Sequence, residues 1–305
     1  MTKTEEQNPT GLAAPAGRAT WRHYLELTKP RLSFLSVVTA MVGYLAALPF
    51  WDWARTLFVM LGTALCAGGV AALNQWMESD LDAKMKRTAD RPIPTGAVQP
   101  GSAFIVGWLM CIAGLAVLFR QVNGQSAFLA LATIVAYLAI YTPAKKWSRW
   151  NTEIGAISGA LPPMIGWAAA GRSNDPLGWS LFAILYTWQM PHFFSLAWTY
   201  RQDYAAAGLR MVSVTDPDGR RTARRAFVWA VLLVAASVLP TLLGYCSWYY
   251  FAAAAALGLW MLKSAITFLN PAKRETEARR LFFISIAYLP LLLTLLVTDR
   301  LIFRF

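Results

Sequence analysis

Apolar runs of about 20 residues alternate with shorter polar segments along most of the chain, and each run is long enough to cross a bilayer as a helix. Each span must satisfy its own backbone hydrogen bonds in lipid, so helix is the expected structure for every run. The pattern therefore predicts an all-α membrane protein with nine transmembrane helices, at residues 32–50, 56–77, 102–119, 126–142, 153–170, 178–199, 226–245, 247–269 and 281–298.

Proline interrupts several of these runs. Proline lacks the N–H group that a helix interior requires, and its ring clashes with the preceding turn. A membrane bundle tolerates the resulting defects where the freed carbonyl groups find partners. We expect kinks or local unwinding at Pro162, Pro163, Pro191, Pro240 and Pro290.

Lysine and arginine are unequally distributed between the polar segments. With the N-terminus in the cytoplasm and the C-terminus outside, the cytoplasmic segments carry 22 of these residues and the outside segments carry five. This excess follows the positive-inside rule and supports both the nine-span count and the orientation. The two longest cytoplasmic segments, 78–101 and 200–225, also contain acids, so we expect chemistry at this face of the membrane.

Composition agrees with a membrane protein. Of the 305 residues, 57% are hydrophobic and 14% are charged, whereas ordinary soluble domains carry about 25% charged residues. The net charge is +12. Orientation and contact with anionic lipid explain these basic residues, so nucleic-acid binding is not expected. Cys66, Cys111 and Cys246 lie in or beside apolar runs without C-x-x-C spacing, which argues against a zinc site or a disulfide framework.

The N-terminal segment, unlike most of the chain, contains no long apolar run. Residues 1–19 lack the apolar core of a secretory signal. Glu5 and Glu6 also argue against a mitochondrial transit peptide. We expect a disordered cytoplasmic tail at 1–19, followed by a single polytopic domain at 20–305.

The end of the second span carries an unusual set of polar side chains. Asn74, Glu78 and Asp82 follow one another at intervals of four residues. On a helix each interval turns the side chain by about 40°, so all three share one face. An amide oxygen and two carboxylates suit Mg²⁺, which takes few protein carboxylates together with water and substrate phosphate oxygens.

Basic residues follow these acids directly. Arg87 and Arg91 lie four residues apart, with Lys84 and Lys86 beside them. The arginine guanidinium group matches phosphate oxygens two at a time. Carboxylates for a metal beside arginines for phosphate suggest a metal-bridged diphosphate. The alternative is an ordinary solvated loop with positive-inside cations and helix-capping acids.

Further candidates lie in the fourth and sixth spans. His192 is an intramembrane histidine, which either handles a proton or ligates a haem iron, unless it only bonds a neighbouring helix. Asp203 would complete the metal and phosphate site, unless it pairs with Arg201 or Arg210. In a diphosphate pocket, the leaving group would be contacted by one of the two lysines that follow the fourth span. The candidates for substrate contact at these span ends are Tyr141, Lys145, Lys146 and Tyr200.

Together these motifs resemble the UbiA-type intramembrane prenyltransferases. NQWMESDLDAKMKRTADRP at 74–92 is similar to the first acidic motif and arginine pair of that family. The closer resemblance is to the protohaem IX farnesyltransferases, also called haem O synthases, and it runs from about residue 21 to the ninth span. It rests on LTKPR at 27–31, YTPAKKWSRWNTEIGAISGALPPMIGWAA at 141–169 and QMPHFFSLAWTYRQDYAAAG at 189–208.

The resemblance implies a nine-helix bundle around a lipid-accessible cavity in the bacterial inner membrane, with its active site facing the cytoplasm. It implies Mg²⁺-dependent transfer of a farnesyl group from farnesyl diphosphate to a vinyl group of haem B, with water addition giving haem O. By match to the motif, Asn74, Glu78 and Asp82 would bind the metal, and Arg87 and Arg91 the phosphates. Membrane lipid and haem A synthase or terminal oxidase assembly are implied partners.

The sequence departs from the wider family at two places. Gln75 and Glu78 stand where aspartates are frequent in the aromatic-acid enzymes, and the region of His192 and Asp203 has fewer acids than their second motif. A porphyrin acceptor would account for the histidine. The alternatives are a UbiA-type enzyme that acts on a quinone precursor and, from another class, a transporter. Transporters often show internal repeats, and we see none.

Overall fold

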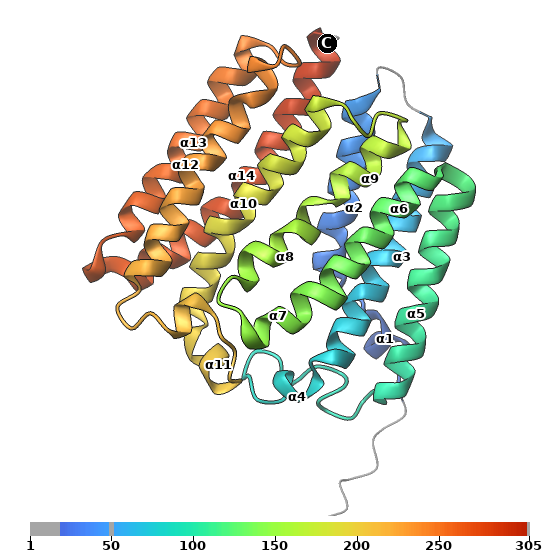
Figure 1. Cartoon of the computed structure of the whole chain (residues 1–305), viewed down its shortest axis with the longest axis vertical. Coiled ribbons are helices and arrows are strands. Elements are labelled where there is room, and N and C mark those ends of the chain that lie inside the picture. Colours follow the sequence, from blue (N-terminus) through green and yellow to red (C-terminus); the bar gives the residue numbers. More distant parts are fainter. Residues whose placement is uncertain (1–18, 49–51, 304–305) are drawn as a thin grey trace, which may run out of the picture.

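The computed structural model describes residues 19–48 and 52–303, and within these ranges it is built from helices and contains no strand. The helices lie roughly side by side in one bundle (Figure 1). Their bounds are α1 Trp21–Leu27, α2 Pro30–Ala47, α3 Trp53–Met77, α4 Ser79–Asp82, α5 Pro100–Val117, α6 Gly124–Val135, α7 Thr142–Trp147, α8 Asn151–Ala160, α9 Pro162–Ala169, α10 Pro176–Thr199, α11 Arg201–Ala206, α12 Arg220–Leu242, α13 Trp248–Phe268 and α14 Arg274–Phe303. Two π-helical turns, Leu118–Val122 and Ala136–Tyr141, extend α5 and join α6 to α7.

Seven of the helical segments in the described ranges are long and apolar enough to cross a membrane. They are Pro30–Ala47, Trp53–Met77, Pro100–Val122, Gly124–Trp147, Arg220–Leu242, Trp248–Phe268 and Pro271–Phe303. The all-helical, multi-pass prediction is thereby confirmed. The expected spans at 153–170 and 178–199 are helical but are not among the seven.

The fifth expected span is broken in the middle. Helix α8 ends at Ala160 and α9 begins at Pro162, so neither piece reaches the length of a span. The sixth expected span, α10, has 24 residues but is not apolar enough, because it includes polar side chains such as Gln189 and His192. Helices α10, α12 and α14 continue through their prolines, so the expected unwinding occurs only at Pro162 and Pro163.

Glycine allows the closest approach between helices. A Cβ atom on Gly166 of α9 would lie 1.8 Å from the carbonyl oxygen of Ala40 of α2, which no side chain permits. Contacts of this kind replace hydrophobic collapse as the means of holding helices together in lipid. Large apolar side chains on the outer faces are exposed, as a lipid-facing surface requires, for example Leu57, Ile105, Leu109, Leu259 and Phe283.

One end of the bundle gathers the short polar elements. Helices α1, α4, α7 and α11 lie there, whereas α14 ends at the opposite end (Figure 1). A small apolar cluster joins the segment after α4 to the segment around α11. It contains Met85, Ala207 and Leu209, with Leu81, Tyr204 and Met211 packed against them. The two longest polar segments are therefore held together across one end of the bundle. The predicted tail at 1–19 falls almost wholly outside the described residues.

Candidate active site

The three predicted metal ligands lie where α3 ends, but they do not share one continuous helix. Glu78 has non-helical backbone angles, φ −110° and ψ 10°, and separates α3 from α4. The hydrogen-bond spacing nevertheless persists, because the N–H of Glu78 donates to Asn74 O at 3.0 Å and that of Asp82 to Glu78 O at 2.8 Å. The expectation of a single helix is thus wrong. The side chains of Asn74, Glu78 and Asp82 are nevertheless all buried.

Asn74 and Glu78 form a buried cluster with two lysines from other elements. Lys29 Nζ donates to Asn74 Oδ1 at 2.7 Å, and Asn74 Nδ2 donates to Glu78 Oε2 at 2.9 Å. Lys145 Nζ lies 2.9 Å from both carboxylate oxygens of Glu78. Asn74 Nδ2 also approaches Thr142 Oγ1 at 3.3 Å. The start of α2, the end of α3 and α7 therefore meet at one charged centre.

The electrostatics of this centre favour an ionised Glu78 carboxylate. Burial opposes the charge on Glu78, but Lys145 and Lys29 outweigh it and lower the pKa of that carboxyl. Burial, with repulsion from Arg91 and Lys145, lowers the pKa of Lys29 to about 7. The nearby carboxylates act against this fall. Lys29, Lys145 and Arg91 thus bring three cationic side chains close to one another, as a polyanion would require.

Asp82 belongs to a second ion pair beside this cluster. Arg91 Nη1 lies 2.5 Å from Asp82 Oδ2, and Thr88 Oγ1 donates to the Asp82 carbonyl at 2.9 Å. These contacts fold the segment after α4 back over the acids in a series of turns. Arg87 lies 5.4 Å above the ring of Tyr200, within the range of a cation–π contact. Of the predicted residues, the structure thus pairs Asp82 with Arg91 and Arg87 with Tyr200.

The donor set fits Mg²⁺ shared with a substrate better than a metal held by protein alone. No group of three or more His, Cys, Asp or Glu side chains within residues 19–48 and 52–303 is placed to hold a metal ion. Mg²⁺, however, usually takes one or two carboxylates and completes its shell with water and phosphate oxygens. Glu78, Asp82 and the amide oxygen of Asn74 are buried hard donors of that kind. Their residue types therefore suit a metal–diphosphate complex.

The two predicted lysines lie in different surroundings. The Lys145 ammonium lies 4.7 Å from the ring centre of Tyr141, so that tyrosine supports the cation that pairs with Glu78. Gly155 of α8 makes room for this ring, because a Cβ there would lie 2.5 Å from it. Lys146 is exposed and forms no ion pair in the described part of the chain. Lys145 is therefore the lysine at the site.

Asp203 lies near the site without contacting the cluster. It occupies the first turn of α11, and its carboxylate has no ion-pair or hydrogen-bond partner among the residues that the structure describes. The alternative expectation, a salt bridge to Arg201 or Arg210, is wrong for both arginines, and the Arg201 guanidinium pairs with Glu275 at 2.7 Å instead. The contact of the neighbouring Tyr204 with the Met85 cluster keeps this helix beside α4.

His192 belongs to α10, faces α14 and does not touch the acidic cluster. Its ring stacks on Trp188 and Phe282, with centroids 5.0 and 4.9 Å away, and Nδ1 lies 2.8 Å from Ser285 Oγ. The single hydroxyl hydrogen of Ser285 is donated to the Phe282 carbonyl at 2.6 Å. The serine must then accept from His192, which places the proton on Nδ1. Nε2 keeps its lone pair and has no partner among the described residues.

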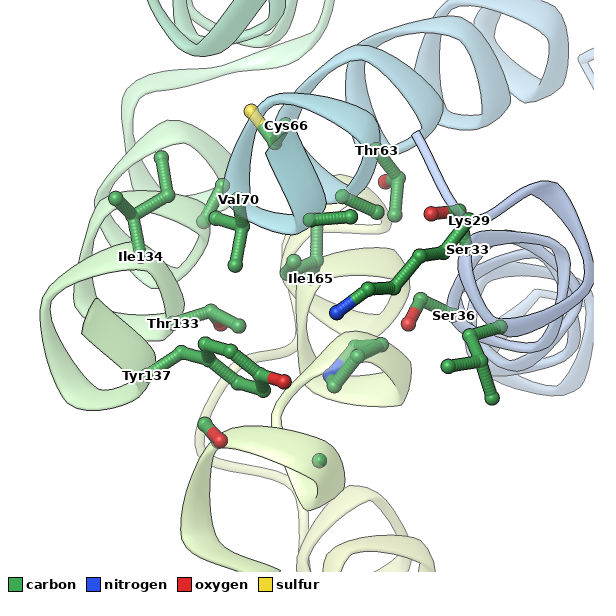
Figure 2. A pocket seen from close by; sticks show the side chains of 17 residues that line it. Lys29, Ser33, Ser36, Thr63, Cys66, Val70, Thr133, Ile134, Tyr137 and Ile165 are labelled. Atoms are coloured by element: carbon green, nitrogen blue, oxygen red, sulfur yellow. The ribbon is translucent and has the colours of Figure 1, made fainter. Parts of the chain in front are cut away.

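A partly open cavity of about 140 Å³ lies behind the charged cluster, lined by residues of α2, α3, α6, α8, α9 and the π-helical turn Ala136–Tyr141 (Figure 2). Lys29 lines it and also bonds Asn74, so this side chain links the cavity to the acids. Its backbone has φ 46°, the only positive value at a non-glycine residue in the described ranges. In the sequence, Lys29 counts among the cytoplasmic positive charges and belongs to LTKPR at 27–31, and nothing local signals that it turns inward.

The chain has close relatives along nearly its whole length. The model of the UbiA prenyltransferase family matches residues 36–287. A protoheme IX farnesyltransferase of Opitutus terrae is 55% identical over 287 residues, which are 94% of this chain and 97% of that protein. The protein of the same name from Solibacter usitatus is 43% identical over 289 residues, which are 92% of this chain and 99% of that protein.

Solved structures share the fold at low sequence identity. Digeranylgeranylglyceryl phosphate synthase matches with a TM-score of 0.77 at 16% identity, over 92% of this chain and 98% of that one. A UbiA homologue from Archaeoglobus fulgidus, bound to GPP and Mg²⁺, matches with a TM-score of 0.60 at 14% identity, over 90% of this chain and 99% of that one. With the family model spanning most of the sequence, the chain belongs to the UbiA prenyltransferase family and is a prenyltransferase.

Proposed function

We propose that this protein is a Mg²⁺-dependent protohaem IX farnesyltransferase. It transfers the farnesyl group of farnesyl diphosphate to a vinyl group of haem B, and water addition completes haem O. The observation that carries the proposal is the relative of that name at 55% identity over 94% of the chain. The structure supports the proposal with a buried cluster of Asn74, Glu78, Lys29 and Lys145 that lies beside a cavity.

The cations of the site bind the diphosphate in this proposal. Arg91 and Lys145 lie directly against Asp82 and Glu78, and Arg87 lies over Tyr200 at the edge of the same region. When bound to Asn74, Glu78 and Asp82, Mg²⁺ supplies charge that stabilises the diphosphate as the C–O bond breaks. The side chains around it hold the leaving group in place, so that its developing charge meets preorganised cations.

His192 binds the acceptor porphyrin in this proposal, as an axial ligand of the haem iron through Nε2. A metal-binding histidine normally donates its other ring N–H to a fixed acceptor, which sets the tautomer and the ring orientation. Ser285 is such an acceptor, and the rings of Trp188 and Phe282 hold the imidazole plane. Asp203, whose carboxylate is unpaired in the described chain, completes the metal and phosphate site from α11.

The membrane arrangement follows from the same proposal. We propose nine spans within a single domain at 20–305, in which α8 with α9 and α10 join the seven longer apolar segments. The N-terminus and the charged end lie in the cytoplasm, the C-terminus lies outside, and the membrane is the bacterial inner membrane. Supporting this, the cytoplasmic assignment gives 22 basic residues against five outside. A lipid-soluble product needs a membrane-bound acceptor, so haem A synthase or an assembling terminal oxidase is the proposed partner.

Product analysis of the purified full-length protein tests this function. With Mg²⁺, haem B and farnesyl diphosphate, mass spectrometry should detect haem O, and a panel of quinone precursors should give no prenylated product. Asp82→Asn should abolish turnover while the folded protein stays in the membrane. Asp90→Asn is the matched control, because Asp90 is exposed on the same segment and forms no ion pair there. Absence of any farnesylated porphyrin would refute the proposal.

A further inference from the structure

The cavity behind Lys29 contains polar groups that lack a partner among the residues that the structure describes. Thr63 Oγ1 is buried and has no hydrogen-bond partner there. The hydroxyl groups of Ser36 and Tyr137, which also line the cavity, have no partner within residues 19–48 and 52–303. In Figure 2 these two oxygens and the Lys29 ammonium point toward the same space. A buried hydroxyl such as that of Thr63 normally finds a partner, and Ser36 and Tyr137 offer unpartnered hydroxyls to whatever enters the cavity.

The break between α8 and α9 adds two backbone acceptors to the same wall. Pro162 and Pro163 have no N–H group, so the carbonyls of Ser158 and Gly159 lack the donor that the next helical turn would supply. Ser158, Gly159 and Pro162 all line the cavity. A freed carbonyl at membrane depth needs a partner from a neighbouring helix or an ordered water.

The size and lining of the cavity fit water and exclude the porphyrin. An apolar cavity of about 150 Å³ stays dry and accommodates benzene, whereas a polar one is hydrated where two to four partners converge. At about 140 Å³ this cavity is far too small for a porphyrin ring. Three unpartnered hydroxyl groups and two free carbonyls exceed the number that one water needs. The remainder of the wall is mainly apolar, including Ala67, Val70, Ile134 and Ile165, so only a few waters can be held.

We propose that this cavity holds the water that becomes the hydroxyl group of the product. The inference rests on the proposed function and assigns its hydration step to Thr63, Ser36 and Tyr137. The allylic C–O bond breaks with its electron pair leaving on the diphosphate, and the vinyl π electrons form the new C–C bond. The water oxygen then bonds to the resulting porphyrin-side cation. Its proton goes to the diphosphate released in the same turnover, which balances atoms and charge.

The position of the cavity explains how a water can be held in place until it is used. Water in bulk would capture the allylic cation before the vinyl group reaches it. A water fixed by hydroxyl groups stays in place until the second cation forms. Lys29 lines the cavity and donates to Asn74, so the held water lies next to the acidic centre where the diphosphate departs. The three hydroxyl-bearing residues act by positioning the water.

Thr63→Val tests the inference, because it removes the unpartnered hydroxyl and keeps the shape. The full-length enzyme is supplied with Mg²⁺, haem B and farnesyl diphosphate in water enriched in ¹⁸O. Mass spectrometry then measures the ratio of the labelled hydroxyl product to the product that lost a proton instead and carries an alkene. The variant should lower this ratio about fivefold, the effect of losing one hydrogen bond of about 1 kcal/mol. Tyr137→Phe and Ser36→Ala should each act in the same direction.

Thr187→Val is the matched control, since this buried threonine donates to Ala183 O at 2.7 Å and does not line the cavity. An unchanged ratio in Thr63→Val and in the Thr63→Val, Tyr137→Phe double variant would overturn the inference. A raised KM for farnesyl diphosphate at an unchanged ratio would also overturn it, since the cavity would then hold the prenyl chain. Wild-type protein that forms no farnesylated porphyrin would instead refute the proposed function.

Discussion

Replacing Lys145 by methionine removes the cation that neutralises a buried carboxylate. Lys145 Nζ lies 2.9 Å from both oxygens of Glu78, and the two side chains are 17% and 9% exposed. Loss of one partner of a buried pair costs about 3–5 kcal/mol, because the other charge stays buried and uncompensated. Here Asn74 still donates to Glu78, and the Lys29 charge acts on it as well. We therefore expect the lower end of that range, about 3 kcal/mol.

The assay is a double-mutant cycle on the free energy of unfolding, measured by adding sodium dodecyl sulfate to the protein in mild detergent micelles. Glu78→Gln in the Lys145→Met background removes both charges, so the double variant should recover most of the lost stability. The coupling energy between the two positions should be about 2–3 kcal/mol. A coupling below about 0.5 kcal/mol would mean that the side chains act independently, and the ion-pair argument would be refuted.

The same double variant separates stability from catalysis. If Glu78 and Lys145 only hold the helices together, a stable double variant should turn over farnesyl diphosphate at close to the wild-type rate. If they bind the metal and the diphosphate, stability returns but activity does not. We expect the second result, with the loss seen in kcat and in the KM for farnesyl diphosphate.

Two further predictions concern neighbouring contacts. Gly155→Ala places a Cβ 2.5 Å from the Tyr141 ring, which must then move away from the Lys145 cation. The KM for farnesyl diphosphate should rise about fivefold, as expected for the loss of a cation–π contact of about 1 kcal/mol. Gly101→Ala, with open space around it, should leave the KM unchanged. His192→Ala should change the absorption spectrum of enzyme-bound haem. Ser285→Ala should have a smaller effect in the same direction, because it only removes the hydrogen bond that orients the His192 ring. Identical spectra for wild type and His192→Ala would exclude iron ligation.

Hydropathy predicts the helices well where they face lipid and less well where they face the site. The two expected spans that are absent from the long apolar set are interrupted either by a helix break or by polar side chains. Gln189 and His192 lower the apolar character of α10, and the Pro162–Pro163 pair divides α8 from α9. These residues face the interior of the bundle and not lipid, so hydropathy alone does not identify the segments that carry them as membrane spans.

The site itself was predictable only in its local part. Four-residue spacing correctly grouped Asn74 and Glu78, which are hydrogen-bonded in the structure. Their cationic partners come from positions 45 and 67 residues away, Lys29 and Lys145. Such pairings depend on how α2 and α7 pack against α3, and no local periodicity encodes that packing. The left-handed backbone at Lys29, which aims its side chain inward, is equally invisible in the sequence.

The ion pairs of the site also resolve an electrostatic difficulty of the proposed function. Glu78 and Asp82 are buried, and two carboxylates without a metal would be costly to keep ionised there. Lys145 and Arg91 remove that cost by pairing with them. Under the proposed function the same two cations become available to the phosphates once the carboxylates take a metal, because the metal then supplies the neutralising charge. The two acids and their paired cations therefore form one exchangeable set, in which each cation has a partner before and after the substrate arrives.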